Sequence, residues 1–434
     1  MVSTTLSKNK VVDTYIVISL FLIPSSFLGL ISYRVFYIPG LFDLRLLSWL
    51  LAMPLLFVCW RSLHGITRTY PGRLLIILVL FVLIRFIVSL FQGIPFREAF
   101  TVFRMGFNTP ISCLAFLCFF NSIDNYRIRR IFKWAFVLFT INLVLYFINY
   151  LGLGIYDNIK EITEETHQGI TITRNLSGYP VYFPLFFVIS FYLTLLSFRP
   201  LTILITLFSL FIVYISATRN FIFTSLITLS IILFFYILKR KSGFFKRVLQ
   251  IIISLVFFFI IVVSLKNDVY QFLKVKFDTT IKVELKENTG TYAYRTRLIE
   301  TSIQEVESTG DIIFGKGYTR FGKRGSYKFV LGGDTLVAPV IFCEGYLGLA
   351  IRIVPIFYFL FWGLKRLRAS GVNQYIGLAM VAVVIGSSVN YVQTTIFFNY
   401  IEYMLYFFVA HRYLVNLEGE EELMEEVRNL AATT

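Results

Sequence analysis

The sequence predicts an all-α, polytopic integral membrane protein, and three observations lead to that prediction. The composition is 57% hydrophobic and only 15% charged, which lies outside the range of an ordinary soluble domain. Apolar runs of about 20 residues recur, and a helix of this length crosses about 30 Å of hydrocarbon. The loops between the runs alternate in charge, as expected for a chain that crosses a membrane repeatedly.

The apolar runs predict about twelve membrane-spanning helices. We place them at residues 14–33, 44–60, 73–93, 104–122, 132–152, 179–197, 200–217, 220–238, 248–265, 336–363, 373–390 and 397–415. The first run lacks the small-residue cleavage site of a signal peptide, so we expect it to be retained. Residues 1–265 then hold the first nine helices, residues 336–415 hold the last three, and residues 416–434 form a tail.

Lys and Arg are concentrated in every second loop, which predicts the orientation of the chain. The positive-inside rule places these loops, the tail and both termini in the cytoplasm. The net charge of +16 is therefore interpreted as basic cytoplasmic loops, and nucleic-acid binding is not expected. The residues concerned are Lys8, Lys10, Arg61, Arg68, Arg73, Arg127, Arg129, Arg130, Lys133, Arg199, residues 239–241, Lys246, Arg247, Lys365, Arg366 and Arg368.

One long polar segment, residues 266–335, interrupts the apolar chain. Unpaired backbone groups are costly in hydrocarbon, so we expect this segment to be an extracytoplasmic loop in water. Inside it, residues 295–308 carry apolar side chains at helical spacing and predict an amphipathic surface helix, which the glycines that follow should end. After Gly332 and Gly333, Asp334 and Thr335 can cap the next membrane helix.

Asp334 is the first candidate for chemistry, because it stands where the chain re-enters the membrane. It can act as a helix cap or as a general base that accepts a proton from a substrate hydroxyl. The arginines expected on the same side offer planar forks that suit phosphate oxygens, and they could bind a pyrophosphate-linked lipid. They are Arg295 and Arg297 in the loop, Arg219 in a short turn, Arg174 in an acidic loop and Arg104 at the start of a span.

The alternative for each arginine is an ion pair with a nearby Glu or with lipid phosphate, and for Arg104 and Arg174 this is favoured. Tyr292 and Tyr294 can stack on sugars or, more in keeping with their position, anchor the loop at the interface.

Three charged residues, Arg85, Arg352 and Glu402, fall inside predicted spans. Such residues are costly in lipid and usually face the bundle or a water-filled cavity, where Arg352 could pair with Glu402. Cys59, Cys113, Cys118 and Cys343 are interpreted as small buried hydrophobes. No Cys, His or carboxylate spacing predicts a metal site, and no cofactor is expected.

Several short motifs occur in a characteristic order: Thr218-Arg219-Asn220, Arg297, Gly315-Lys316-Gly317, Asp334-Thr335, and Gly345 with Leu347-Gly348. This order resembles the bacterial O-antigen polymerase and O-antigen ligase superfamily, which has a similar number of spans and one large, late periplasmic loop. The ligase-type pattern has His-Asn where Asp334-Thr335 stand, and a Gly eleven residues after that His, as Gly345 is after Asp334. The change from His to Asp favours a polymerase. Arg295 replaces Arg297 if the loop helix is shifted by two residues.

The resemblance implies a fold similar to the GT-C class of glycosyltransferases, and a polymerase at the outer face of the bacterial inner membrane. Such an enzyme joins undecaprenyl-pyrophosphate-linked oligosaccharides into O-antigen or a similar surface polysaccharide, by metal-independent, inverting transfer. Arg219 with Arg295 or Arg297 would stabilise the departing pyrophosphate, and Asp334 would act as the base. Arg174, Arg104, Tyr292 and Tyr294 would contact substrate. A chain-length regulator in the membrane is an expected partner.

Three alternatives remain open. An O-antigen ligase would transfer the glycan to lipid A. A flippase or transporter predicts inverted repeats and broken helices near the midplane, and the sequence shows neither; a transporter would also not need so long an outer loop. A non-catalytic scaffold would tolerate the loss of Arg219 and Asp334 together.

Overall fold

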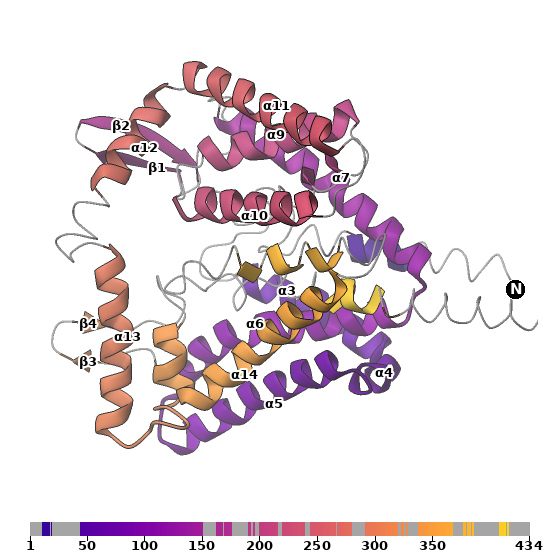
Figure 1. Ribbon diagram of the computed structural model, residues 1–434. Coiled ribbons are helices and arrows are strands. Elements are labelled where there is room, and N and C mark those ends of the chain that lie inside the picture. Colours follow the sequence, from indigo (N-terminus) through magenta and orange to yellow (C-terminus); the bar gives the residue numbers. More distant parts are fainter. Residues whose placement is uncertain are drawn as a thin grey trace, which may run out of the picture.

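The computed structural model describes residues 11–17, 19, 44–150, 162–167, 169–175, 190–191, 194–195, 199–215, 219–238, 244–265, 267–279, 291–319, 323–324, 327–328, 337–367, 376–378, 380–382, 384–385, 408–413 and 415. Helices dominate these residues (Figure 1). They are α3 (Leu44–Val58), η1 (Trp60–Ser62), α4 (Leu63–Thr67), α5 (Tyr70–Phe91), α6 (Phe96–Asn121), α7 (Asn125–Tyr150), α9 (Pro200–Ile215), α10 (Arg219–Leu238), α11 (Phe244–Leu265), α12 (Asn267–Thr279), α13 (Thr291–Ser308) and α14 (Val337–Arg366).

The helices form two neighbouring groups (Figure 1). In the first group α5 packs against α6 and α14, α3 and α4 pack against α6, and α13 lies on α14. In the second group α9 contacts α7, α10 and α11, and α11 contacts α12. The core of the first group is rich in phenylalanine, and the largest fully buried side chains along α6 are Phe116, Phe119 and Phe120.

In the part of the chain that the structure describes, two helices, α5 and α14, are long and apolar enough to cross a membrane. The number rises to four if each of two bent helix pairs counts as one span. These helices agree with the predicted class, a helical membrane protein. Twelve spans stay a prediction, because several of the predicted segments lie outside the described residues.

The two bent pairs change predicted boundaries. The segment expected at 44–60 ends at Val58, and the chain turns by 72° into residues 60–67, where the polar Arg61 and Ser62 follow Trp60. The span expected from Arg104 begins at Phe96, directly after Pro95. It bends by 49° between Arg104 and Gly106, where Pro110 removes a helical hydrogen bond. Arg104 therefore lies inside α6 and not at its start.

Two hairpins depart from the all-α expectation. Strands β1 (Ile162–His167) and β2 (Ile170–Asn175) pair antiparallel, with His167 opposite Ile170. The run is rich in Ile and Thr, which favour strands, and Gly169 supplies a positive φ of 81° at the turn. A shorter hairpin joins β3 (Lys323–Arg324) to β4 (Tyr327–Lys328).

The predicted amphipathic helix is confirmed as α13, which begins at Thr291, four residues earlier than expected. Leu298 and Val306 are buried on its inner face. The helix ends where Gly310 adopts a φ of 77° and the amide of Asp311 donates to the carbonyl of Val306, at 2.9 Å. The predicted cap at Asp334 and Thr335 lies outside the described residues.

The first group of helices has two distinct ends, which we name by their residues. At the loop end, Gly315–Thr319 meets the end of α5 and the starts of α6 and α14. At the arginine end, Asp13 binds Arg127, at 2.6 Å, and Arg130, while Arg129 donates to Tyr413. Residues near both ends of the chain thus meet the arginines in the first turns of α7, at the same end of the bundle.

Candidate functional site

A break in α14 at Gly345 is the centre of the site. Gly345 has φ 68° and ψ −169°, so the helix is interrupted between its first turns and its long second part. A β-carbon at this position would lie 2.3 Å from the carbonyl oxygen of Ile313. Both the positive φ and the close approach of the loop therefore require glycine.

The loop between α13 and α14 occupies this break. Gly315 faces Gly345 directly, because a β-carbon on Gly315 would lie 2.5 Å from the backbone nitrogen of Gly345. We call this contact the glycine junction. The break frees backbone groups that hydrocarbon cannot satisfy, and the loop pairs with them. The bonds are Lys316 N to Phe342 O (2.8 Å), Gly317 N to Cys343 O (3.1 Å), Tyr346 N to Ile312 O (3.0 Å) and Leu347 N to Ile313 O (3.1 Å).

Arg85 closes the junction from α5. Its Nη2 donates to the carbonyl of Cys343, at 3.1 Å, and to that of Gly315, at 3.3 Å. The residue is 3% exposed. The predicted intramembrane arginine therefore faces the bundle and joins α5, the loop and α14 at one point.

A buried ion pair lies beside the junction. Arg352 donates from Nε to Oε2 of Glu344, at 2.7 Å, and from Nη2 to Oε1, at 2.6 Å. The hydroxyl of Tyr318 donates to the same Oε1, at 2.8 Å. Glu344 and Tyr318 are fully buried. This bidentate arrangement satisfies the carboxylate on both oxygens.

The partner of Arg352 is thus Glu344, and the pairing considered with Glu402 lies outside the described residues. Sequence reasoning missed Glu344 because the break at Gly345 separates it from Arg352 and changes the helical spacing. The sequence did contain one indication of this ion pair: Glu344 is a carboxylate inside an apolar run, and such a residue in a membrane helix usually has a cation nearby.

Burial of its ring raises the pKa of Tyr318, and the nearby Glu344 carboxylate raises it further. The hydroxyl therefore stays protonated and acts as a donor. Because Glu344 is fully buried and already accepts three hydrogen bonds, it cannot take a proton from a substrate outside the bundle. Its role is to position the loop.

Further contacts hold the loop end. The amide of Tyr318 donates to Oγ of Ser89, at 2.8 Å, and Thr319 donates to Glu98 at the start of α6, at 2.6 Å. Lys316 pairs with Glu305 of α13, at 2.9 Å. The loop is thus bonded to α5, α6, α13 and α14, so α13 has a fixed position on the bundle.

The arginines of the predicted site are partly brought together. On α13, Arg297 and Tyr294 are exposed and Arg295 is half-buried, while Tyr292 lies in the first turn. Leu298, next to Arg297, packs in one cluster with Ala338 of α14. Asp334 lies outside the described residues, and it precedes Ala338 by four positions in the sequence.

Arg219 and Arg174 lie on elements that converge elsewhere. Arg219 is the first residue of α10, and Arg174 pairs with Thr163 in the hairpin. Ile222 of α10 and Ile170 of β2 both pack against α12, around Val269, Phe272 and Leu273. The polar segment thus touches the second helix group through α12 and the first through α13 (Figure 1).

Arg104 lies on α6, apart from both α13 and the elements that meet at α12. It lies two residues before Gly106, and a β-carbon on Gly106 would meet Nη2 of Arg352 at 3.2 Å. This part of α6 therefore borders the buried ion pair. Among the described residues, no three His, Cys, Asp or Glu side chains gather at a spacing that could hold a metal ion.

No family model matches this chain, and no curated protein matches its sequence.

Proposed function

We propose that this protein is a polysaccharide polymerase of the bacterial inner membrane. About twelve helices would cross the membrane, with both termini in the cytoplasm and residues 266–335 outside. Asp13 and Tyr413, which come from the two ends of the chain, contact Arg127 and Arg129 at the start of α7. This supports the orientation, since the positive-inside rule assigns these arginines and both termini to one side.

The contact between Leu298 and Ala338 is the observation that carries the proposal. It holds the helix of Arg297 against the helix that begins after Asp334. Four residues of chain span at most about 14 Å, so the proposed base and the proposed phosphate-binding arginine belong to one local unit. The bonded loop at the glycine junction holds α13, and Arg297 with it, in a fixed position on the bundle, and a fixed geometry is what electrostatic catalysis requires.

The proposed reaction is an inverting glycosyl transfer. A hydroxyl of the acceptor sugar attacks the anomeric carbon of the donor chain, and a new glycosidic C–O bond forms. The C–O bond to the polyprenyl pyrophosphate breaks on the opposite face, and the pyrophosphate leaves with the electron pair. Asp334 takes the proton of the attacking hydroxyl.

Fixed arginines supply the positive charge in this proposal. Arg297 or Arg295 on α13 and Arg219 on α10 would donate to the oxygens of the leaving pyrophosphate. Arg174, Arg104, Tyr292 and Tyr294 are the further candidates for substrate contact. The elements of Arg219 and Arg174, α10 and β2, pack against α12, which belongs to the same polar segment as α13. This packing supports a site to which both α12 and α13 contribute.

A glycan ladder tests the proposal. Cells that lack the gene are complemented with wild type, Arg219→Ala, Arg297→Ala or Asp334→Ala, and the membrane level of each variant is measured. The expected result is surface glycans of one repeat in the deletion strain, with the ladder restored by wild type and not by the variants. A full ladder from all three variants at normal protein levels would contradict the assigned residues.

The same experiment separates the alternatives. Full-length chains that accumulate on the polyprenyl carrier would indicate an O-antigen ligase. Absence of any outward glycan would indicate a flippase or transporter. The break in α14 bears on this last alternative, because the sequence showed no sign of a broken helix. In transporters such breaks line a water-filled cavity, whereas this one is filled by loop backbone and Arg85. The observation therefore favours the polymerase.

A further inference from the structure

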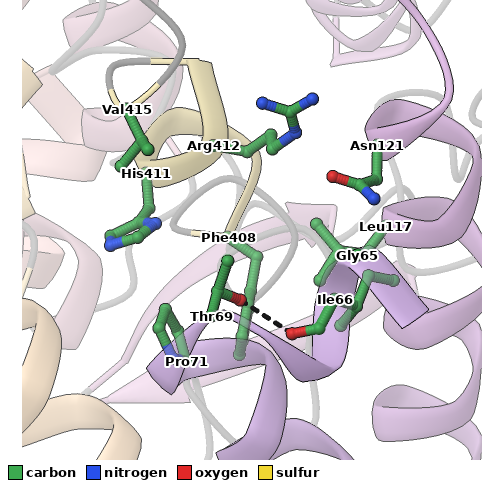
Figure 2. Close-up of a pocket in the computed structure, with 10 residues that line it drawn as sticks. All are labelled: Gly65, Ile66, Thr69, Pro71, Leu117, Asn121, Phe408, His411, Arg412 and Val415. Atoms are coloured by element: carbon green, nitrogen blue, oxygen red, sulfur yellow. Dashed lines mark hydrogen bonds between the residues drawn. The ribbon is translucent and has the colours of Figure 1, made fainter. Parts of the chain in front are cut away.

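A second candidate site lies at the arginine end, opposite the glycine junction. It is a cavity of about 240 Å³ between α4, the start of α5, the end of α6 and the segment that carries Phe408, His411, Arg412 and Val415. Half of its lining is apolar: Ile66, Pro71, Leu117, Phe408 and Val415. Figure 2 shows Arg412 and Asn121 in the upper part of the cavity and Pro71 and Thr69 in the lower part.

Arg412 differs from the other polar residues of this lining. Its buried Nε has no hydrogen-bond partner among the described residues, and none of the described carboxylates pairs with it. The other three polar side chains are already engaged. Thr69 donates to Ile66 O (2.9 Å), Asn121 donates to Ser62 O (3.1 Å), and Nε2 of His411 lies 2.9 Å from the hydroxyl of Tyr358.

The chemistry of the cavity selects the class of ligand. A partly buried guanidinium without a carboxylate favours an anion, and its planar fork matches phosphate oxygens. The apolar half of the lining does not favour a fully hydrated ion. The anion should therefore belong to a molecule that also has an apolar part, which this half of the lining can contact. Other basic residues of this end, among them the exposed Arg61 and Arg73, strengthen the attraction for anionic lipid.

We propose that this cavity binds the phosphate group of an anionic phospholipid from the cytoplasmic leaflet. Arg412 donates to the phosphate oxygens, and Leu117, Phe408 and Val415 contact the glycerol and the first carbons of the acyl chains. Basic pockets between membrane helices are known to hold such headgroups. The site is distinct from the polymerase site, so it stands whether or not the protein has that activity.

Native mass spectrometry and thermal unfolding of the full chain in an uncharged detergent test the proposal. The probes are phosphatidylglycerol, phosphatidylcholine and inorganic phosphate at equal concentration. We expect phosphatidylglycerol alone to bind and to raise the unfolding temperature. Arg412→Gln should weaken its affinity about tenfold, which corresponds to the loss of one charged hydrogen bond. Arg68→Gln is the matched control, since Arg68 is exposed at the same end and lies outside the cavity.

A second variant covers the case in which Arg412→Gln does not fold. Val415 is 41% exposed at the cavity, so Val415→Trp should fold and fill the space while keeping Arg412. It should abolish binding of phosphatidylglycerol. Equal stabilisation by inorganic phosphate, an equal loss in Arg68→Gln, or unchanged binding in Val415→Trp would each overturn the proposal.

Discussion

Gly315 and Gly345 face each other so closely that neither position has room for a β-carbon. On Gly315 it would lie 2.5 Å from the nitrogen of Gly345, and on Gly345 it would lie 2.6 Å from the nitrogen of Gly315. The two residues come from the loop after α13 and from α14, so their contact joins the polar segment to a membrane helix. The position of Arg297 therefore depends on two glycines that no substrate needs to touch.

Gly345→Ala should separate the loop from α14. The added methyl group would meet backbone at 2.3 Å, and the positive φ adds about 1 kcal/mol of strain or more. We expect a large fall in the unfolding temperature in detergent. Gly310→Ala is the matched control, because Gly310 has φ 77° and open space around it, and it should show only the strain of the backbone. Equal effects of the two substitutions would contradict the close contact at the junction.

Glu344→Gln should destabilise the protein by about 3–5 kcal/mol, because it leaves Arg352 as a buried charge without its partner. The double variant Glu344→Leu with Arg352→Met removes both charges and should unfold at a higher temperature than the single variant. Glu305→Gln removes the half-buried ion pair between α13 and Lys316 of the same loop, and it should cost less than about 1 kcal/mol. If Glu344→Gln unfolds like wild type, the ion pair does not hold the loop.

Tyr318→Phe should change how stability depends on pH above about pH 10, where an unfolded tyrosine titrates. Burial raises the pKa of Tyr318 in the folded protein, so the folded state keeps its proton when the unfolded state has lost it. This contribution is fully present below pH 10 and is lost as the pH rises further, by up to about 1.4 kcal/mol per pH unit. The free energy of unfolding, measured from pH 9 to 11, should fall more steeply with pH in wild type than in Tyr318→Phe. Parallel curves would show that the ring is not buried.

The sequence predicted what depends on local pattern. The apolar length of α5, the amphipathic face of α13 around Leu298, and the helical membrane class all follow from periodicity and composition. The hairpin at Ile162–Asn175 was not predicted, because its glutamates suggested an acidic loop. The alternating Ile and Thr of the same segment favour strands.

The glycine junction was only half predictable. Gly315, Gly317 and Gly345 were noticed as motif residues, but nothing in their spacing showed that the loop would fill a break in α14. Tyr318 and Glu344 were missed because their contacts depend on that break, and a long-range contact of this kind has no local sequence pattern. The geometry of the candidate site around Arg219 and Asp334 likewise stays a prediction.

Labelling of introduced cysteines should reveal the orientation of the bundle. In a Cys59→Ser background the remaining native cysteines are buried, so they should react slowly. Ser308 lies at the exposed end of α13, and Thr67 is exposed at the arginine end. We expect a membrane-impermeant maleimide to label Ser308→Cys in intact spheroplasts and Thr67→Cys only after permeabilisation. The reverse pattern would place the polar segment in the cytoplasm and rule out the proposed polymerase.

Arg297→Ala should separate catalysis from folding. Its side chain is exposed on α13, so its removal should change the free energy of unfolding by less than about 0.5 kcal/mol. If Arg297 stabilises the leaving pyrophosphate, the rate of polymerisation should fall about 100-fold or more. Arg297→Lys should recover only part of this loss, because an ammonium group cannot form the bidentate contact. Glu300→Ala, on the exposed surface of the same helix, is the control and should keep a full glycan ladder. A normal ladder from Arg297→Ala together with a lost ladder from Arg295→Ala, at equal protein levels, would move the catalytic role to Arg295.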